Sequence, residues 1–103
     1  MEMTKEEKAQ DYKLKRRYGI DLARYREMLE DQGNRCAICG KPADKEKKAL
    51  AVDHNHKTGY IRGLLCTHCN TNILKYLRDD MKIACGLRAY LQRAITLDLG
   101  WKQ

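Results

Sequence analysis

The sequence predicts a small α+β fold in which a short β-hairpin and the helix after it are flanked by further helices. Two short apolar runs, residues 50–54 and 60–65, are bounded by turn-forming residues and predict an antiparallel hairpin. Apolar residues at helical spacing recur on both sides of that hairpin. With 103 residues, the chain is expected to form one domain spanning 1–103.

Four of the five cysteines form two C-x-x-C pairs, Cys36 with Cys39 and Cys66 with Cys69. Two intervening residues let both sulfurs of a tight turn reach one metal ion at ~2.3 Å, and a second such turn completes a tetrahedron. In a reducing cytosol this spacing predicts structural Zn²⁺ rather than disulfides. Four thiolates leave no open position on the ion, so it should stabilise the fold without catalysing a reaction.

The helices before the hairpin can be assigned from their caps. Thr4 and Glu7 fit a capping box, so a first helix is expected to run from there to about Tyr18. Asp21 is the expected cap of a second helix over 22–32. Together they form a helical N-terminal arm, residues 1–33.

A zinc-bound core, residues 34–78, is expected to follow this arm and to end with a helix over 68–77. The C-terminal part, 79–103, predicts one further helix to about residue 96. Cys85 lies in that pattern and is expected to be a small core residue. The other side chains that we expect on the buried side of this helix are Ile83, Ala84, Leu87, Tyr90, Leu91 and Ala94.

The charge of the chain predicts a polyanionic partner. There are 21 Lys and Arg against 14 Asp and Glu, a formal net charge of +7. Nucleic acid is favoured over membrane, because no segment carries a broad apolar face and no apolar run approaches the ~20 residues of a membrane span. The first residues lack the apolar core of a signal peptide, so we expect a cytoplasmic protein.

A closed zinc site would hold the hairpin against the start of the third helix, because Cys66 follows the second strand and Cys69 opens the helix. Asp53 and His54 at the end of the first strand can then meet Asn70. A carboxylate and an amide oxygen suit Mg²⁺ or Mn²⁺, and a neighbouring imidazole can act as general base toward water. An ideal strand turns adjacent side chains to opposite faces, so this arrangement requires a kink or a strand end after Asp53.

Two runs carry a resemblance to a known family: VDHNHKTG over 52–59, and IRGLLC-x-x-CN over 61–70. Together with the first cysteine pair they resemble the recombination endonuclease VII family of phages, which belongs to the His-Asn-His, or ββα-metal, nucleases. The resemblance extends over about residues 18–91. It implies a metal-dependent DNA endonuclease, phage-encoded and working in the host cytoplasm, that leaves 3′-hydroxyl and 5′-phosphate ends.

The resemblance also implies roles for single residues. Asp53 and Asn70 would hold the catalytic Mg²⁺ or Mn²⁺, His54 would be the general base, and His56 would assist by contacting the phosphate or the substrate. Near these positions, Lys57 and Arg62 are candidates to clamp DNA phosphates.

Two questions stay open at the level of sequence. The substrate is duplex or branched DNA, cut by nicking or by junction resolution, and resolution would require two active sites in one particle, hence a homodimer. The alternative function is a non-catalytic zinc module that binds nucleic acid or protein. Such a module has no need for Asp53, His54 and Asn70 together, which favours the nuclease.

Overall fold

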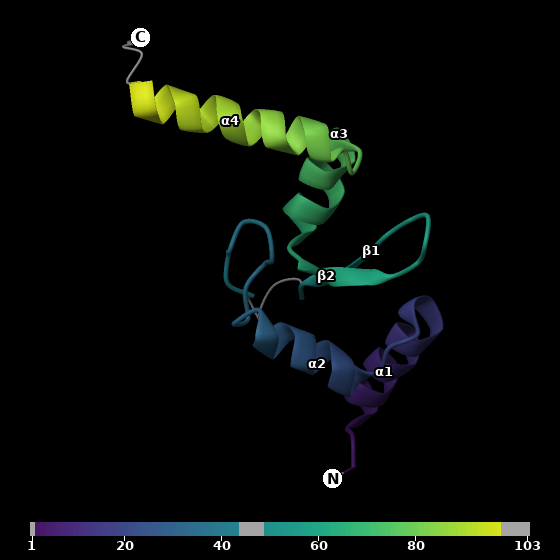
Figure 1. Ribbon diagram of the computed structural model, residues 1–103. Coiled ribbons are helices and arrows are strands. Elements are labelled where there is room, and N and C mark those ends of the chain that lie inside the picture. Colours follow the sequence, from purple (N-terminus) through teal and green to yellow (C-terminus); the bar gives the residue numbers. More distant parts are fainter. Residues whose placement is uncertain (1, 44–48, 98–103) are drawn as a thin grey trace.

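The computed structural model describes residues 2–43 and 49–97, the last four of them by their backbone alone (Figure 1). It confirms the predicted α+β fold. In chain order the elements are α1 (Lys5–Tyr18), α2 (Leu22–Asp31), β1 (Ala51–His54), β2 (Ile61–Leu65), the π-helix η1 (Cys69–Ile73), α3 (Leu74–Leu77) and α4 (Met81–Leu97).

Helices α1 and α2 form a corner, and polar side chains cap the start of each helix. Thr4 and Glu7 make the reciprocal hydrogen bonds of a capping box at the start of α1, and Gly19 ends that helix in the left-handed conformation. Asp21 caps α2 through the backbone N–H of Arg24. The buried carboxylate of Asp11 accepts a hydrogen bond from the first backbone N–H of α2 at 2.8 Å, so one charge ties the two helices together.

The hydrophobic core lies between these helices and one face of the hairpin. The helices contribute Leu14, Leu22, Tyr25 and Met28, and the hairpin region contributes Leu50, Val52, Leu64 and Leu65. The Tyr25 hydroxyl donates a hydrogen bond of 2.7 Å to the carbonyl of Leu50. Burial of one hairpin face leaves the other face to the residues of the candidate site.

The hairpin register shifts between Asp53 and His54, but the extra residue lies in β2 and not in the first strand, where the sequence analysis required a kink. Asp53 pairs with Gly63, but the next residue, His54, pairs with Ile61. Arg62 is therefore an extra residue in β2 without a partner in β1. A β-bulge of this kind bends the strand and re-aims the side chain that it carries.

Helix α4 projects away from the rest of the molecule (Figure 1). The structure measures 59 × 31 × 21 Å and has a radius of gyration of 17.4 Å, against about 13 Å for a compact domain of this length. Among the described elements, α4 contacts mainly α3. Of the helices described in residues 2–43 and 49–97, none is long and apolar enough to cross a membrane.

The expected burial of α4 is therefore wrong. Ile83, Leu87, Tyr90 and Leu91 are 48–70% exposed, and Cys85 is exposed rather than part of a core. Ala84 is half-buried, and the side chain of Ala94 lies outside the described residues. The apolar spacing correctly predicts a helix with an apolar face, but none of the described elements packs over that face.

Candidate metal centre and active site

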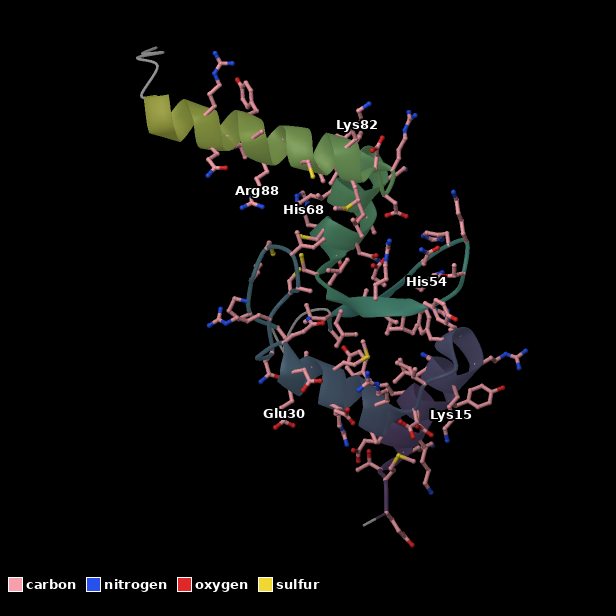
Figure 2. All side chains as sticks on the ribbon, viewed as in Figure 1. Lys15, Glu30, His54, His68, Lys82 and Arg88 are labelled. Atoms are coloured by element: carbon pink, nitrogen blue, oxygen red, sulfur yellow. The ribbon has the colours of Figure 1, made fainter. Side chains whose placement is uncertain are left out.

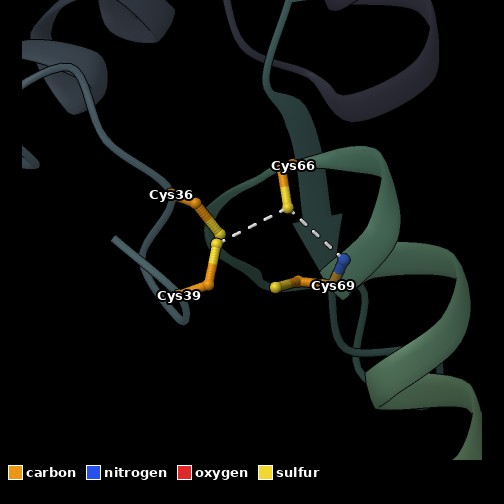
Figure 3. A group of neighbouring side chains, drawn as sticks. All are labelled: Cys36, Cys39, Cys66 and Cys69. Atoms are coloured by element: carbon orange, nitrogen blue, oxygen red, sulfur yellow. Dashed lines mark hydrogen bonds between the residues drawn. The ribbon is translucent and has the colours of Figure 1, made fainter. Parts of the chain in front are cut away.

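The four predicted cysteines converge between the loop after α2 and the junction of β2 with η1 (Figure 3). Their sulfur atoms all lie within 4.8 Å of one another, and those of Cys39 and Cys66 are 3.8 Å apart. Four sulfurs around a tetrahedral ion with bonds of ~2.3 Å would be separated by about 3.8 Å. A disulfide needs about 2.05 Å, and all four cysteines are free. The four cysteines could hold a metal ion such as zinc.

Each C-x-x-C pair is held by its own backbone hydrogen bonds. In the first, Gly40 adopts a left-handed conformation that lets its N–H donate to the carbonyl of Cys36 at 3.0 Å. In the second, the N–H of Cys69 points at the sulfur of Cys66 at 3.4 Å, and the N–H of Asn70 donates to the Cys66 carbonyl at 3.0 Å. Backbone donors aimed at sulfur are typical of turns that stabilise a thiolate.

The electrostatics of the cluster differ between its two buried cysteines. Burial acts to raise the pKa of the Cys36 thiol, but hydrogen bonds from the backbone at Cys66, Cys39 and Ile38 outweigh it and bring that pKa to about 6. Burial and the neighbouring sulfurs raise the pKa of the Cys69 thiol instead. A bound cation would stabilise the deprotonated form of both buried thiols.

Gln32, which the sequence analysis did not single out, connects the first cysteine loop to β2. Its side-chain amide accepts from the N–H of Leu64 at 2.9 Å and donates to the carbonyls of Leu64 and Arg35 at 2.9 and 2.7 Å. The amide therefore pairs with β2 much as a third strand would. A Cβ at Gly63 would lie 3.3 Å from Oε1 of the Gln32 side chain, which is tighter than most contacts of a Cβ atom. This explains why glycine suits that position.

On the other face of the hairpin, a cavity of about 500 Å³ brings together most of the predicted site residues. Asp53 comes from the end of β1, Asn70 from the π-helical turn, and His56 from the loop of the hairpin. Turns with π-helical bonding are frequent at functional sites. The complete lining is Asp53, His56, Arg62, Asn70, Thr71, Leu74, Lys75, Arg78 and Asp79.

Arg62 makes the strongest polar contact in this cavity. Its Nε and Nη2 atoms donate to Oδ2 and Oδ1 of Asp53 at 2.7 and 3.1 Å, and Nη2 also donates to Asp79 at 3.2 Å. The carboxylate of Asp53 is only 9% exposed. The hydrogen bonds that Arg62 donates to Asp53 are the main reason why the pKa of the Arg62 guanidinium is raised.

His54 and Lys57 do not line the cavity. His54 lies at the end of β1 (Figure 2), and its ring centroid is 5.9 Å from that of Tyr18 and 4.7 Å from that of His56, which does line the cavity. Lys57 is exposed in the hairpin loop, where its N–H donates to the side chain of Asn55 at 2.8 Å. The extra residue lies in β2, so β1 keeps its regular alternation between Asp53 and His54, and the His54 ring lies beside Tyr18 of α1 while Asp53 lines the cavity.

Comparison with known proteins places this arrangement in a family. Residues 11–93 match recombination endonuclease VII. The chain belongs to the recombination endonuclease VII family. The match covers both cysteine pairs, the hairpin and all residues that line the cavity, so the predicted resemblance is confirmed.

Two similar proteins come from mycobacteriophages. The Gene 59 protein of Mycobacterium phage D29 is 49% identical over 78 residues, which cover 76% of this chain and 42% of that protein. The Gene 59 protein of Mycobacterium phage L5 is 53% identical over 62 residues, which cover 60% of this chain and 37% of that protein. The chain thus corresponds to less than half of either relative. No solved structure matches the chain.

Proposed function

We propose that this protein is a metal-dependent DNA endonuclease of the His-Asn-His type that hydrolyses phosphodiester bonds to 3′-hydroxyl and 5′-phosphate ends. The observation that carries the proposal is the cavity beside the hairpin, where a buried carboxylate, an amide, an imidazole and three basic side chains face one space. A module that only binds nucleic acid needs the basic side chains but not the other three groups.

The oxygen donors fit a hard divalent cation. Asp53, from β1, and Asn70, from η1, line one cavity, and they would hold Mg²⁺ or Mn²⁺. When bound, the cation would stabilise negative charge on the phosphate and on the departing 3′ oxygen. Asp53 offers two carboxylate oxygens that already bind a cationic group, the Arg62 guanidinium, so the position is suited to positive charge.

The two histidines of the hairpin take the two remaining roles, proton transfer and contact with the phosphate. We assign His54 as the general base that takes a proton from the attacking water, and His56 as the side chain that contacts the phosphate. Their rings are 4.7 Å apart at their centroids, so both can reach groups on one phosphodiester. The Tyr18 ring also lies near His54, with the two centroids 5.9 Å apart. A positioned general base contributes about 10²–10⁴-fold to a rate.

In this proposal the four cysteines bind a structural Zn²⁺ ion. Two of its cysteines precede the hairpin and two follow it, so one ion would join segments that are 26 residues apart in the chain. A chain of this length buries too little surface for high stability, which makes such a connection valuable.

DNA, duplex or branched, is the proposed partner. Arg62, Lys75 and Arg78 line the cavity and Lys57 lies on the adjacent loop, so the phosphates of a strand would meet positive charge on both sides of the reacting bond. Junction resolution requires two active sites in one particle, and we propose the exposed apolar face of α4 as the surface for a second copy.

Cleavage assays on supercoiled plasmid, linear duplex and a four-way junction, each with Mg²⁺ or with chelator, test this function. Cleavage should require the cation, and the three substrates distinguish nicking from resolution. Asp53→Asn and His54→Ala should each reduce the rate at least about 100-fold. His68→Ala is the matched control, because His68 is the remaining histidine and its ring contacts Asn72 rather than the cavity (Figure 2).

Two results would contradict the proposal. Equal cleavage by wild type and Asp53→Asn would remove the cavity from the reaction. Binding of DNA without cleavage under any cation condition would favour the zinc module that only binds. If His56→Ala loses more activity than His54→Ala, the two histidines have exchanged the roles assigned here.

A further inference from the structure

The contact between Arg62 and Asp53 uses both oxygens of the carboxylate that the proposed function assigns to the catalytic cation. Two separate nitrogens of the guanidinium bind the two oxygens, at 2.7 and 3.1 Å. This bidentate geometry is the strongest form of carboxylate pairing by arginine. A cation that approaches Asp53 therefore meets a positive group already bound to both oxygens, and the two cationic groups repel each other and compete for the carboxylate.

A second carboxylate, that of Asp79, can serve as the hydrogen-bond partner of the displaced guanidinium. Asp79 accepts from the same Nη2 atom at 3.2 Å, and its side chain is 41% exposed, so it has room to take a larger share of the guanidinium. Arg78 and Asp79 both adopt left-handed backbone conformations at the turn between α3 and α4. Residues other than glycine rarely adopt this conformation, and such strain concentrates at functional sites.

The bulge in the hairpin explains why Arg62 reaches Asp53 at all. Asp53 is paired with Gly63, so a regular strand would turn the neighbouring Arg62 side chain to the opposite face of the hairpin. The extra residue in β2 cancels that alternation and brings Arg62 to the same face as Asp53.

We propose that Arg62 is a resident counter-ion that competes with the divalent cation for Asp53, and that cation binding shifts the guanidinium toward Asp79 and the DNA phosphate. This inference rests on the proposed function, because it takes Asp53 as a ligand of the cation. It assigns Arg62 a positioning role: the guanidinium holds the buried carboxylate in a fixed orientation until the cation arrives. The same side chain then faces the cavity that receives the phosphate.

The competition has a direct consequence for cation affinity in the absence of DNA. Zinc-loaded protein is titrated with Mn²⁺, and free Mn²⁺ is followed by electron paramagnetic resonance. Arg62→Gln should bind Mn²⁺ about tenfold more tightly than wild type, a change of about 1.4 kcal/mol. Lys75→Gln is the matched control, because it removes the same charge from the same cavity at an exposed helical position without touching Asp53. Any gain in Mn²⁺ affinity in Lys75→Gln measures the effect of removing one positive charge from the cavity.

Asp79 provides a second and opposite test. Asp79→Asn removes the alternative partner of the guanidinium, so it should weaken Mn²⁺ binding in the wild-type background and have a smaller effect in the Arg62→Gln background. Loss of a negative charge that acts only through space would weaken binding equally in both. Equal effects in the two backgrounds would overturn the proposed transfer to Asp79.

The main outcome that overturns the inference is an Arg62→Gln variant that binds Mn²⁺ no more tightly than Lys75→Gln. If Arg62→Gln fails to fold by circular dichroism, Arg62→Lys replaces it. Lysine keeps the charge but cannot bind both carboxylate oxygens in the fork geometry of arginine, so a gain of about threefold is expected and no gain contradicts the inference. Asp53→Asn separates the two proposals: unchanged Mn²⁺ affinity would refute Asp53 as a ligand and hence the proposed function itself.

Discussion

Gln32 provides the sharpest test of how the candidate site is supported. Its side-chain amide makes three hydrogen bonds, two to the backbone of Leu64 and one to the carbonyl of Arg35. Leu64 is completely buried, and it lies on β2 two residues after Arg62. Truncation by Gln32→Ala would therefore disturb the strand that carries one wall of the cavity.

The three hydrogen bonds do not contribute equally. The carbonyl of Leu64 also accepts from the N–H of Ala37 at 3.1 Å, and the carbonyl of Arg35 belongs to an exposed residue that water can reach. The N–H of Leu64 is the group that loses its acceptor in a buried position, at a cost of about 1–3 kcal/mol. We therefore expect Gln32→Ala to destabilise the fold by about 2 kcal/mol, which lowers the Tm by roughly 10 °C in a chain of this size.

Thermal and urea unfolding at a fixed zinc concentration measure this cost. The zinc concentration must be held constant because a ligand that binds only the folded state adds to its apparent stability. Gln10→Ala is the matched control: it removes the same amide from an exposed position on α1 and should stay within about 0.5 kcal/mol of wild type. If Gln32→Ala is as stable as Gln10→Ala, the amide does not support β2 in the way described.

Three further predictions concern other parts of the molecule. Cys36→Ser should lose bound zinc, measured by atomic absorption, together with its folded circular dichroism spectrum, whereas Cys85→Ser should keep both; a folded, zinc-free Cys36→Ser variant would contradict the structural role. Hydrogen bonding to the first N–H of α2 and to Lys15 lowers the pKa of Asp11 below 3.8, so its stabilising contribution is present above that pH and is lost as the pH falls through the lowered value. Asp11→Asn should therefore be less stable than wild type near neutral pH and converge with it in acid, and a constant difference during acid titration would refute this. Leu87→Glu, on the exposed face of α4, should halve a dimeric mass in analytical ultracentrifugation, and a wild type that stays monomeric at high concentration would refute the proposed second copy.

The elements that the sequence predicted well are those whose signals are local. The capping box at Thr4, the helix cap at Asp21 and the two C-x-x-C pairs each involve residues within four positions of one another. Their geometry is fixed by backbone hydrogen bonds that form within the turn itself, so a short stretch of sequence contains the necessary information. The strands of the hairpin follow for the same reason, because a short loop joins them.

The features that sequence could not predict depend on register or on a partner. The contact of Arg62 with Asp53 requires a bulge, and nothing in the alternation of residues 61–65 marks where an extra residue enters the strand. The role of Gln32 depends on a strand that begins 29 residues later. The apolar spacing of α4 predicts a face that packs against something, and it gives no information on whether the covering surface comes from the same chain.

The two proposed metal sites are coupled through a single peptide bond. Cys69, which is completely buried, and Asn70, which lines the cavity, are adjacent residues in the same π-helical turn. Asp53 reaches that cavity from β1, which pairs with β2, and β2 leads directly into Cys66. The separation of the carboxylate and the amide is therefore set by the hairpin register and by the turn from β2 into η1. An ion bound to Cys66 and Cys69 would fix that turn, so we expect a zinc site without catalytic chemistry of its own to help position Asn70 beside Asp53.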